Sequence, residues 1–294
     1  MQQHAAIRGI IAYPVTPFPA DGTGIDEPAF RRVVEALLAT SPAAVAILGS
    51  AGESAYLRDD EWRRAVELGV KIVAGAVPLI VGISELTTDA AIAKAKFAEE
   101  AGADRLMVIP ISYWKLGDPE VFAHFEAIAE ATSLPIMIYN NPATSGVDMS
   151  PALMVRMVRE IAGIDLIKES SGDLHRMHAI HELSGGTIPF YNGANHLAFE
   201  ALAIGAHGWC TAAPNLLGID PAQLVAHIDA GELDQARALF FKLLPVLRFI
   251  VHGGLPTTVK AGLRLQGLEA GDPRRPLQPL SGERLEELRS LLAA

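Results

Sequence analysis

The stretch that decides the fold runs from residue 106 to residue 139 and reads LMVIPISYWKLGDPEVFAHFEAIAEATSLPIMIY. An apolar run of strand length at 106–109 is followed by a pattern of helical length at 119–131 and by a second apolar run at 136–139. Short apolar runs that alternate with amphipathic segments are typical of parallel strands joined by crossover helices. This stretch therefore predicts one unit of strand, helix and strand.

The same unit repeats along the chain. The sequence predicts strands at residues 10–12, 45–48, 79–81, 106–109, 136–139, 166–167, 189–191 and 208–210. It predicts helices between and after them at 27–40, 59–74, 88–101, 119–131, 150–161, 173–183, 195–204 and 221–230. Eight alternations favour a closed (β/α)8 barrel over an open sheet, so the predicted fold class is α/β.

The end of the chain predicts helices alone, at residues 232–250, 256–267 and 281–292. At 294 residues one domain is expected. We predict that residues 1–230 form the barrel and that residues 231–294 form a helical extension of the same domain.

Composition restricts the partners that the chain can have. Hydrophobic residues make up 50% of the chain and the formal net charge is −10, which disfavours nucleic acid and anionic membranes. No segment approaches the roughly 18 apolar residues of a membrane span, and the first residues lack the charged region followed by a long apolar stretch that is typical of a signal peptide. We therefore expect a cytoplasmic protein that acts on small molecules. Cys210, the only cysteine, allows neither an intrachain disulfide nor a thiolate zinc site, but leaves a thiol nucleophile open.

Lys168 stands at the end of the sixth apolar run, in the segment IDLIKES at residues 164–170. The carboxyl ends of barrel strands face the active site, and lysine is rarely buried without a purpose. An inward amine at this position would be desolvated, which favours its neutral, nucleophilic form. Lys168 is therefore a candidate nucleophile, although a lysine that pairs with Glu169 or reaches to solvent fits the position equally well.

Tyr139 ends the fifth apolar run, directly before the tripeptide NNP. Its phenol would lie at the same rim as Lys168 and on the neighbouring strand. A hydroxyl in that place can pass protons to and from a carbinolamine. Taken without this context, a core tyrosine with a satisfied hydroxyl is the commoner outcome.

Two glycine-containing loops follow strands. The segment GSAGE at residues 49–53 could turn backbone NH groups inward and form an anion-binding nest for a carboxylate. The signal is weak by itself, because such loops usually reflect only a tight turn and this spacing matches no dinucleotide or phosphate-loop fingerprint. Gly193, after the seventh strand, also fits a simple turn.

His175, His178 and His181 recur at every third residue of a predicted helix and would share one face. Because no cysteine and no clear carboxylate partner accompanies them, a solvated face fits them better than a metal site. We therefore expect no metal. The sequence also lacks the Gly-x-Ser-x-Gly elbow of a serine hydrolase.

Four ordered motifs resemble those of the dihydrodipicolinate synthase and N-acetylneuraminate lyase family, and the likeness runs from about residue 7 to the end. AYPVTPF at residues 12–18 is similar to the family's first-strand signature, and residues 49–53 are similar to its Gly-Thr-Thr-Gly-Glu loop. YNNP at residues 139–142 matches its Tyr-Asn-x-Pro segment, and IKE at residues 167–169 matches its lysine strand. The shared order makes the resemblance specific.

The resemblance implies a class I aldolase that forms a Schiff base between Lys168 and pyruvate or a related 2-oxo acid, without metal or organic cofactor. It makes Tyr139 the proton-transferring phenol. It makes Ser50 and Ala51 the residues whose backbone NH groups hold the substrate carboxylate, with the Ser50 hydroxyl in the proton relay. Ser170 would position the bound substrate.

The resemblance also implies a homotetramer that is a dimer of dimers. In the synthases of this family, a tyrosine after the fourth strand crosses a dimer interface and completes the proton relay. Tyr113 lies near that place, although the loop spacing differs by about one residue.

Three departures from the family pattern concern the substrate. Ala51 replaces a hydroxyl residue of the loop and so removes one hydrogen-bonding group. Thr144 stands where the synthases carry an arginine for the second substrate's carboxylate, which argues against aspartate semialdehyde. Gly193 is followed by Ala194 and Asn195 instead of the acidic pair of sialic acid lyases, which argues against sialic acid. Thr144, Gly193 and Asn195 remain candidates for substrate binding.

The predicted function is a lyase that cleaves, condenses or dehydrates a small 2-oxo acid through Lys168, for example a 2-keto-3-deoxy sugar acid. Aldol cleavage, dehydration and deamination share one imine, so the sequence leaves the reaction and the substrate open. The alternative within the family is 4-hydroxy-tetrahydrodipicolinate (dihydrodipicolinate) synthase activity. The alternative of another class is a barrel that binds a metabolite without catalysis, against which the retention of Lys168 and Tyr139 weighs.

Overall fold

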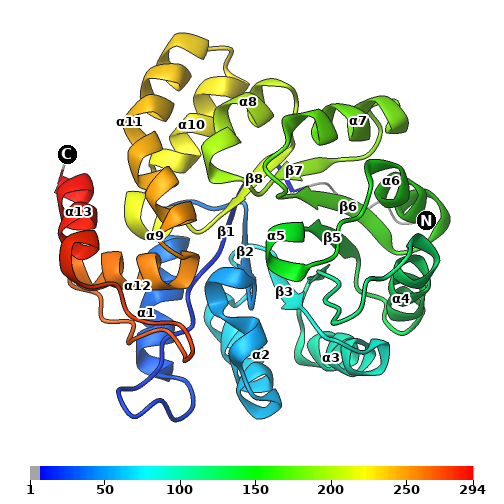
Figure 1. Cartoon of the computed structure of the whole chain (residues 1–294), viewed down its shortest axis with the longest axis horizontal. Coiled ribbons are helices and arrows are strands. Elements are labelled where there is room, and N and C mark those ends of the chain that lie inside the picture. The colour runs from blue at the N-terminus through cyan, green and yellow to red at the C-terminus, as the bar shows by residue number, and fades with distance from the viewer. Residues whose placement is uncertain (1–6, 294) are drawn as a thin grey trace. The chain divides into compact units, whose positions relative to one another are not determined.

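The computed structural model describes residues 7–293, in which eight parallel strands close into a barrel in chain order (Figure 1). The strands are β1 (Gly9–Ala12), β2 (Ala44–Ile47), β3 (Leu79–Ile83), β4 (Arg105–Val108), β5 (Ile136–Asn140), β6 (Ile164–Glu169), β7 (Phe190–Asn192) and β8 (Gly208–Thr211). All eight predicted strands are present, with ends that differ from the prediction by at most two residues. The predicted (β/α)8 barrel is therefore confirmed.

The strands form because their residues are apolar on both faces, as parallel strands covered by helices require. In β2, β3, β4, β5, β7 and β8 every residue is buried. The apolar runs of the sequence therefore form the core of the barrel. The few polar residues inside these strands are exceptions to this pattern.

Helices alternate with the strands, and a group of helices follows the last strand. The helices are α1 (Glu27–Leu38), α2 (Asp59–Val73), α3 (Thr88–Ala101), α4 (Asp118–Glu130), α5 (Pro142–Ser145), α6 (Pro151–Glu160), α7 (Leu174–Ser184), α8 (Ala198–Ala203), α9 (Pro214–Leu217), α10 (Asp220–Asp229), α11 (Leu233–His252), α12 (Leu255–Leu265) and α13 (Gly282–Ala293). Short 3-10 turns are η1 (Ser50–Gly52), η2 (Ser54–Tyr56) and η3 (Asn195–Leu197). Every predicted helix is present. Within the described residues, no helix has the length and apolar character that crossing a membrane requires.

The barrel divides into two compact units. The first comprises the stretch that ends at Gly9 together with Ile80–Cys210, and the second comprises Ile10–Leu79 with the stretch that starts at Thr211. In the first unit, β4, β5, β6 and β7 are neighbours. In the second unit, α12 packs against η1, α9, α11 and α13. Each unit is described by itself below.

Candidate active site

Lys168 lies on β6 in the first unit and is 5% exposed. Tyr139 on β5 is its partner in the strand register, so both side chains point to the same face of the sheet. The Lys168 Nζ lies 3.7 Å from the centroid of the Tyr139 ring and 3.8 Å from the Sδ of Met107 on β4. A buried amine is thus held between an aromatic face and a thioether, a place where it can act as a nucleophile.

Glu169 follows Lys168 on β6 and points to the opposite face, because successive residues of a strand alternate. Its fully buried carboxylate accepts hydrogen bonds from Asn140 Nδ2 at 3.0 Å and from the Ser171 backbone N–H at 2.6 Å. It also pairs with Arg176 of α7 at 3.2 Å. This network occupies Glu169 on the helix side of the sheet and argues against a structural ion pair with Lys168.

The Tyr139 hydroxyl accepts a hydrogen bond from the Asn141 amide at 3.0 Å. Asn140 between them accepts a hydrogen bond from the backbone N–H of Met149 at 3.0 Å, which fixes the loop after β5. The predicted Tyr-Asn-x-Pro segment is thus organised around the phenol. The hydroxyl of Tyr139 contacts the loop after β5, whereas its ring contacts the lysine.

Tyr191 on β7 is also in register with Lys168, but its environment suits a structural role. Its hydroxyl donates a hydrogen bond to the Ile7 carbonyl at 2.5 Å. Burial is the main cause that raises the pKa of Tyr191. Of the two tyrosines beside Lys168 in the sheet, Tyr139 is therefore the better proton carrier.

Close packing requires a glycine at position 193, whereas the sequence indicated only a simple turn there. A methyl group placed on Gly193 would lie 1.7 Å from Ser170 Oγ and 3.0 Å from Lys168 Cε. The Ser170 Oγ is buried and has no hydrogen-bond partner among residues 7–293. Ser170, Gly193 and Lys168 therefore converge, and the serine presents a hydroxyl that a bound molecule can satisfy.

The other predicted substrate contacts of this unit have different surroundings. Asn195 is buried at the start of η3 and accepts a hydrogen bond from the indole of Trp209 at 3.3 Å. Thr144 in α5 is exposed. Tyr113 is 89% exposed and packs edge to face against Trp114, with the ring centroids 5.8 Å apart. The structure thus brings together Lys168, Tyr139, Ser170 and Gly193, and leaves Thr144 and Tyr113 at the surface.

The predicted 49–53 loop belongs to the second unit. Ser50 is half-buried and Ala51 is buried, and both lie in η1. The backbone N–H groups of Gly52 and Glu53 close the turn on the carbonyls of Gly49 and Ser50. Thr16, in the first-strand motif, donates its hydroxyl to the Gly52 carbonyl at 2.7 Å. Two of the motifs that carry the resemblance are thus in direct contact.

Sequence reasoning missed a cluster of buried charges beside this loop. Glu53 pairs with Lys260 of α12 at 2.7 Å, and Arg274 pairs with Glu61 of α2 at 2.6 Å. The available signal was Lys260 itself, the only charged residue in the predicted helical stretch TTVKAGL. Lysine is rarely buried without a purpose, so Lys260 was a candidate for a specific contact for the same reason as Lys168.

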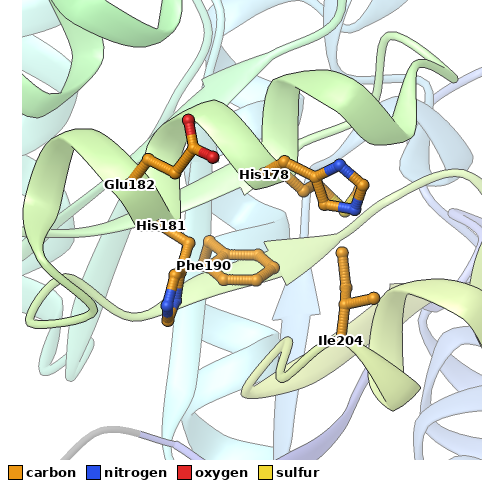
Figure 2. Close-up of a pocket in the computed structure, with 6 residues that line it drawn as sticks. His178, His181, Glu182, Phe190 and Ile204 are labelled. Carbon is orange, nitrogen blue, oxygen red and sulfur yellow. The ribbon is translucent and has the colours of Figure 1, made fainter.

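The three histidines of α7 are exposed, as the predicted solvated face requires. His178 and His181 border a pocket of about 170 Å³ together with Glu182, Phe190 and Ile204 (Figure 2). Phe190 precedes Tyr191 on β7, so this pocket lies on the face of the sheet opposite to Lys168. In the part of the chain that the structure describes, no group of three His, Cys, Asp or Glu side chains could hold a metal ion.

Comparisons with known proteins agree with the family that the four motifs indicate. The model of the dihydrodipicolinate synthetase family matches residues 6–294. The chain is 35% identical over 278 residues to 4-hydroxy-tetrahydrodipicolinate synthase 2 of Halalkalibacterium halodurans, which covers 95% of this chain and 94% of the relative. It is 32% identical over 279 residues to the 4-hydroxy-tetrahydrodipicolinate synthase of Bacillus subtilis, which covers 95% of this chain and 96% of that enzyme.

Solved structures give the same result. A crystal structure from Pseudomonas aeruginosa, provisionally named a dihydrodipicolinate synthetase, is 52% identical with a TM-score of 0.96 and covers 98% of this chain and 99% of that chain. Dihydrodipicolinate synthase from Thermotoga maritima is 29% identical with a TM-score of 0.93 and covers 98% of both chains. The chain belongs to the dihydrodipicolinate synthetase family and is a lyase of the class I aldolase type.

Proposed function

We propose that the protein forms an imine between Lys168 and a small 2-oxo acid such as pyruvate, and uses it to cleave, condense or dehydrate the substrate. The observation that carries this proposal is the buried Lys168 amine, stacked on Tyr139 and next to the unsatisfied Ser170 hydroxyl. A structural lysine would not need a vacant hydrogen-bonding group beside it. A nucleophile that receives a polar substrate does need such a group, which can form a hydrogen bond with the substrate.

The steps of the proposed reaction follow from the chemistry of amines and carbonyls. The neutral Lys168 amine attacks the C2 carbonyl carbon, and the resulting carbinolamine loses its hydroxyl as water to give the imine. Tyr139 passes the protons that these steps release and consume. The protonated imine then accepts the electron pair of a bond to C3 and becomes an enamine. In cleavage this is the C3–C4 bond: the C4 hydroxyl gives up its proton, the aldehyde leaves, and the enamine takes a proton at C3. In condensation and dehydration it is a C3–H bond, and the enamine then either attacks the carbonyl carbon of an aldehyde or expels the protonated C4 hydroxyl as water. Hydrolysis of the resulting imine releases the 2-oxo acid and restores the Lys168 amine.

The remaining site residues are assigned by membership of the family. The backbone NH groups of Ser50 and Ala51 would hold the substrate carboxylate, and the Ser50 hydroxyl would join the proton relay. Ser170 would contact the bound substrate. Gly193 would leave room for the substrate and Asn195 would line its site, whereas the exposed side chain of Thr144 offers only an outer contact.

A 2-keto-3-deoxy sugar acid is the substrate class that we favour. Thr144 is a short, exposed hydroxyl residue where the synthases carry an arginine, so it offers no cation for the carboxylate of aspartate semialdehyde. The second candidate is 4-hydroxy-tetrahydrodipicolinate synthase activity, which is favoured by the names of the relatives at 32% and 35% identity.

One experiment separates these candidates. The protein is incubated with a panel of 2-keto-3-deoxy sugar acids, and pyruvate release is followed with a coupled lactate dehydrogenase assay, alongside mass spectrometry for loss of water. A parallel reaction contains pyruvate and aspartate semialdehyde. Turnover of a sugar acid supports the favoured class, whereas condensation alone supports the synthase. Lys168→Ala should abolish both activities, and the exposed Lys242→Ala should abolish neither.

We further propose that the chain assembles as a cytoplasmic homotetramer, a dimer of dimers, that works without metal or organic cofactor. The exposed aromatic pair of Tyr113 and Trp114 supports an interface at the loop after β4, since large aromatic side chains are enriched in subunit contacts. In that assembly Tyr113 would complete the proton relay. Light scattering tests the tetramer, and a Tyr113→Phe variant that keeps the tetramer tests the relay.

A further inference from the structure

Three buried charged side chains and one half-buried arginine hold the end of the 49–53 loop in the second unit. They are Glu53, Lys260, Arg274 and Glu61. The side chains of Lys260 and Glu53 are 2% and 0% exposed. Taking full charges out of water is costly even when they are paired, and hydrophobic residues could fill the same volume. The Schiff-base chemistry does not use these charges, so their place beside the loop calls for another explanation.

Glu53 stands at the point where η1 passes into η2. Its backbone is left-handed, with φ 57° and ψ 31°, which is uncommon for a residue with a side chain. The carboxylate lies 2.7 Å from Lys260 Nζ and accepts a hydrogen bond from the Arg274 backbone N–H at 2.6 Å. One carboxylate oxygen faces the ammonium of α12 as an ion pair, and the other accepts the hydrogen bond from the segment after it. These contacts offset the cost of the left-handed backbone at Glu53.

The lysine that meets Glu53 is itself held from several sides. Its ammonium lies 4.0 Å from the centroid of the Phe18 ring and donates a hydrogen bond to the Asp272 carbonyl at 3.1 Å. The Arg274 guanidinium stacks on the same ring at 4.2 Å and pairs with Glu61 at 2.6 Å. Glu61 also pairs with the exposed Arg58 at 3.0 Å, so each of the two carboxylates has at least one cationic partner. The position of Lys260 is fixed by its surroundings and not by Glu53 alone.

The same loop is anchored a second time. The hydroxyl of Thr16 donates a hydrogen bond at 2.7 Å to the carbonyl of Gly52, the residue before Glu53. Arg274 comes from a segment that passes close to the first-strand motif, because a methyl group on Gly271 would lie 2.1 Å from the Phe18 carbonyl oxygen. The C-terminal segment is thus built against the loop and its neighbour, and not merely appended to the barrel.

We propose that Lys260 and Glu53 are positioning residues for the substrate carboxylate, because their ion pair fixes the loop backbone that presents Ser50 and Ala51. This inference rests on the proposed function, which assigns the carboxylate to those two residues. Neither charged side chain has to touch the substrate. Loss of the pair weakens the binding of the 2-oxo acid and leaves the imine chemistry intact once the substrate is bound.

The test titrates pyruvate against covalent trapping by borohydride and reads the adduct by intact-protein mass spectrometry. In Lys260→Met, the pyruvate concentration for half-maximal trapping should rise about tenfold or more, with the same maximal yield at saturation. Glu53→Gln keeps the size of the side chain and should show the same separation. Lys260→Arg keeps the positive charge but changes the shape of the charged group. Its pyruvate concentration for half-maximal trapping should therefore lie between those of the wild type and Lys260→Met.

The matched control is Lys94→Met. Lys94 is also buried and also pairs with a carboxylate, that of Glu85, but it lies in the first unit. This variant should lose thermal stability without a change in half-saturation. The inference is wrong if Lys260→Met and Glu53→Gln unfold cooperatively and still trap pyruvate at the wild-type concentration, or if Lys94→Met shifts it equally. Absence of an adduct on the wild type would instead overturn the proposed function itself.

Discussion

The ring and the hydroxyl of Tyr139 make separate contacts, so their proposed roles can be tested separately. The ring face lies 3.7 Å from the amine, whereas the hydroxyl bonds to Asn141. Tyr139→Phe keeps the first contact and removes the proposed proton carrier, so we expect kcat to fall by about 100-fold or more, the range that positioned acid and base groups contribute. Steady-state kinetics measure the effect. A kcat within about fivefold of wild type would exclude the proton-transfer role.

The site requires a residue without a side chain at position 193. In Gly193→Ala the new methyl group would overlap Ser170 Oγ and press on Lys168 Cε, and overpacking of this kind costs about 1–3 kcal/mol. We expect lower stability in urea and a slower reaction with pyruvate. Gly117→Ala is the control, because its methyl group would meet its nearest neighbours at 3.6 Å, an ordinary contact. Equal behaviour of the two variants would show that the close approach has no consequence.

Some site residues could be predicted from the sequence and others could not. Lys168 and Tyr139 end apolar runs, and strand alternation then dictates that they share a face. The unsatisfied hydroxyl of Ser170 depends on the path of Gly193, which no local pattern encodes. Lys260 meets Glu53 across 207 positions of the chain, a pairing that only the folded topology creates.

Strand β6 and helix α7 are joined by the ion pair of the buried Glu169 and the half-buried Arg176. Arg176→Met removes the cation and leaves the fully buried carboxylate uncompensated, which should lower the free energy of unfolding by about 3–5 kcal/mol. Urea denaturation measures this. Arg31→Met, which breaks an exposed pair with Glu35, should change it by less than about 0.5 kcal/mol. A small effect for Arg176→Met would mean that Asn140 and Ser171 suffice to hold Glu169.

Element ends were predicted less well where polar residues begin a strand. The prediction started β4 at Leu106 and β6 at Leu166, whereas the strands start at Arg105 and Ile164. Arg105 and Asp165 interrupt the apolar runs because they pair with each other through both guanidinium nitrogens. A charge inside a strand is invisible to an apolar pattern when its partner lies 60 positions away.

The sequence also could not predict the shortest helices or one of the helix caps. Helices α5 and α9 have four residues each, too few to show a helical period. Ser150 caps α6 as its position before Pro151 predicts, through a hydrogen bond from the Leu153 N–H. Asp118 also precedes a proline but does not cap α4. Glu120 accepts a hydrogen bond from the Gly117 N–H, and Asp118 is already the first residue of the helix.

At the scale of the whole molecule, Lys260 links stability to pH. Burial, opposed by Glu53, lowers the pKa of Lys260 from 10.5 to about 8. Between these values the unfolded chain binds the proton and the folded chain does not, so this group makes the unfolding free energy rise with pH, by at most about 1.4 kcal/mol per unit. The stability of the wild type relative to Lys260→Met should therefore increase from pH 8 to pH 10. Urea titrations at each pH measure it, and a difference independent of pH would contradict the shift.

The closed barrel could be predicted because eight apolar runs alternate with helical patterns, and such a count has few other solutions. The division of the chain into a barrel at 1–230 and an extension at 231–294 remains a prediction. The tetramer also remains one, since assembly depends on exposed residues such as Tyr113, whose partners the pattern of a single chain does not encode.

The central claim is that Lys168 forms an imine with a 2-oxo acid, and reductive trapping tests it most directly. The protein is treated with pyruvate and borohydride, digested, and mapped by mass spectrometry, beside Lys168→Ala. The account predicts one reduced pyruvate adduct on the peptide that contains Lys168, and none on the variant. An adduct on another lysine, or no adduct with any 2-oxo acid, would contradict it.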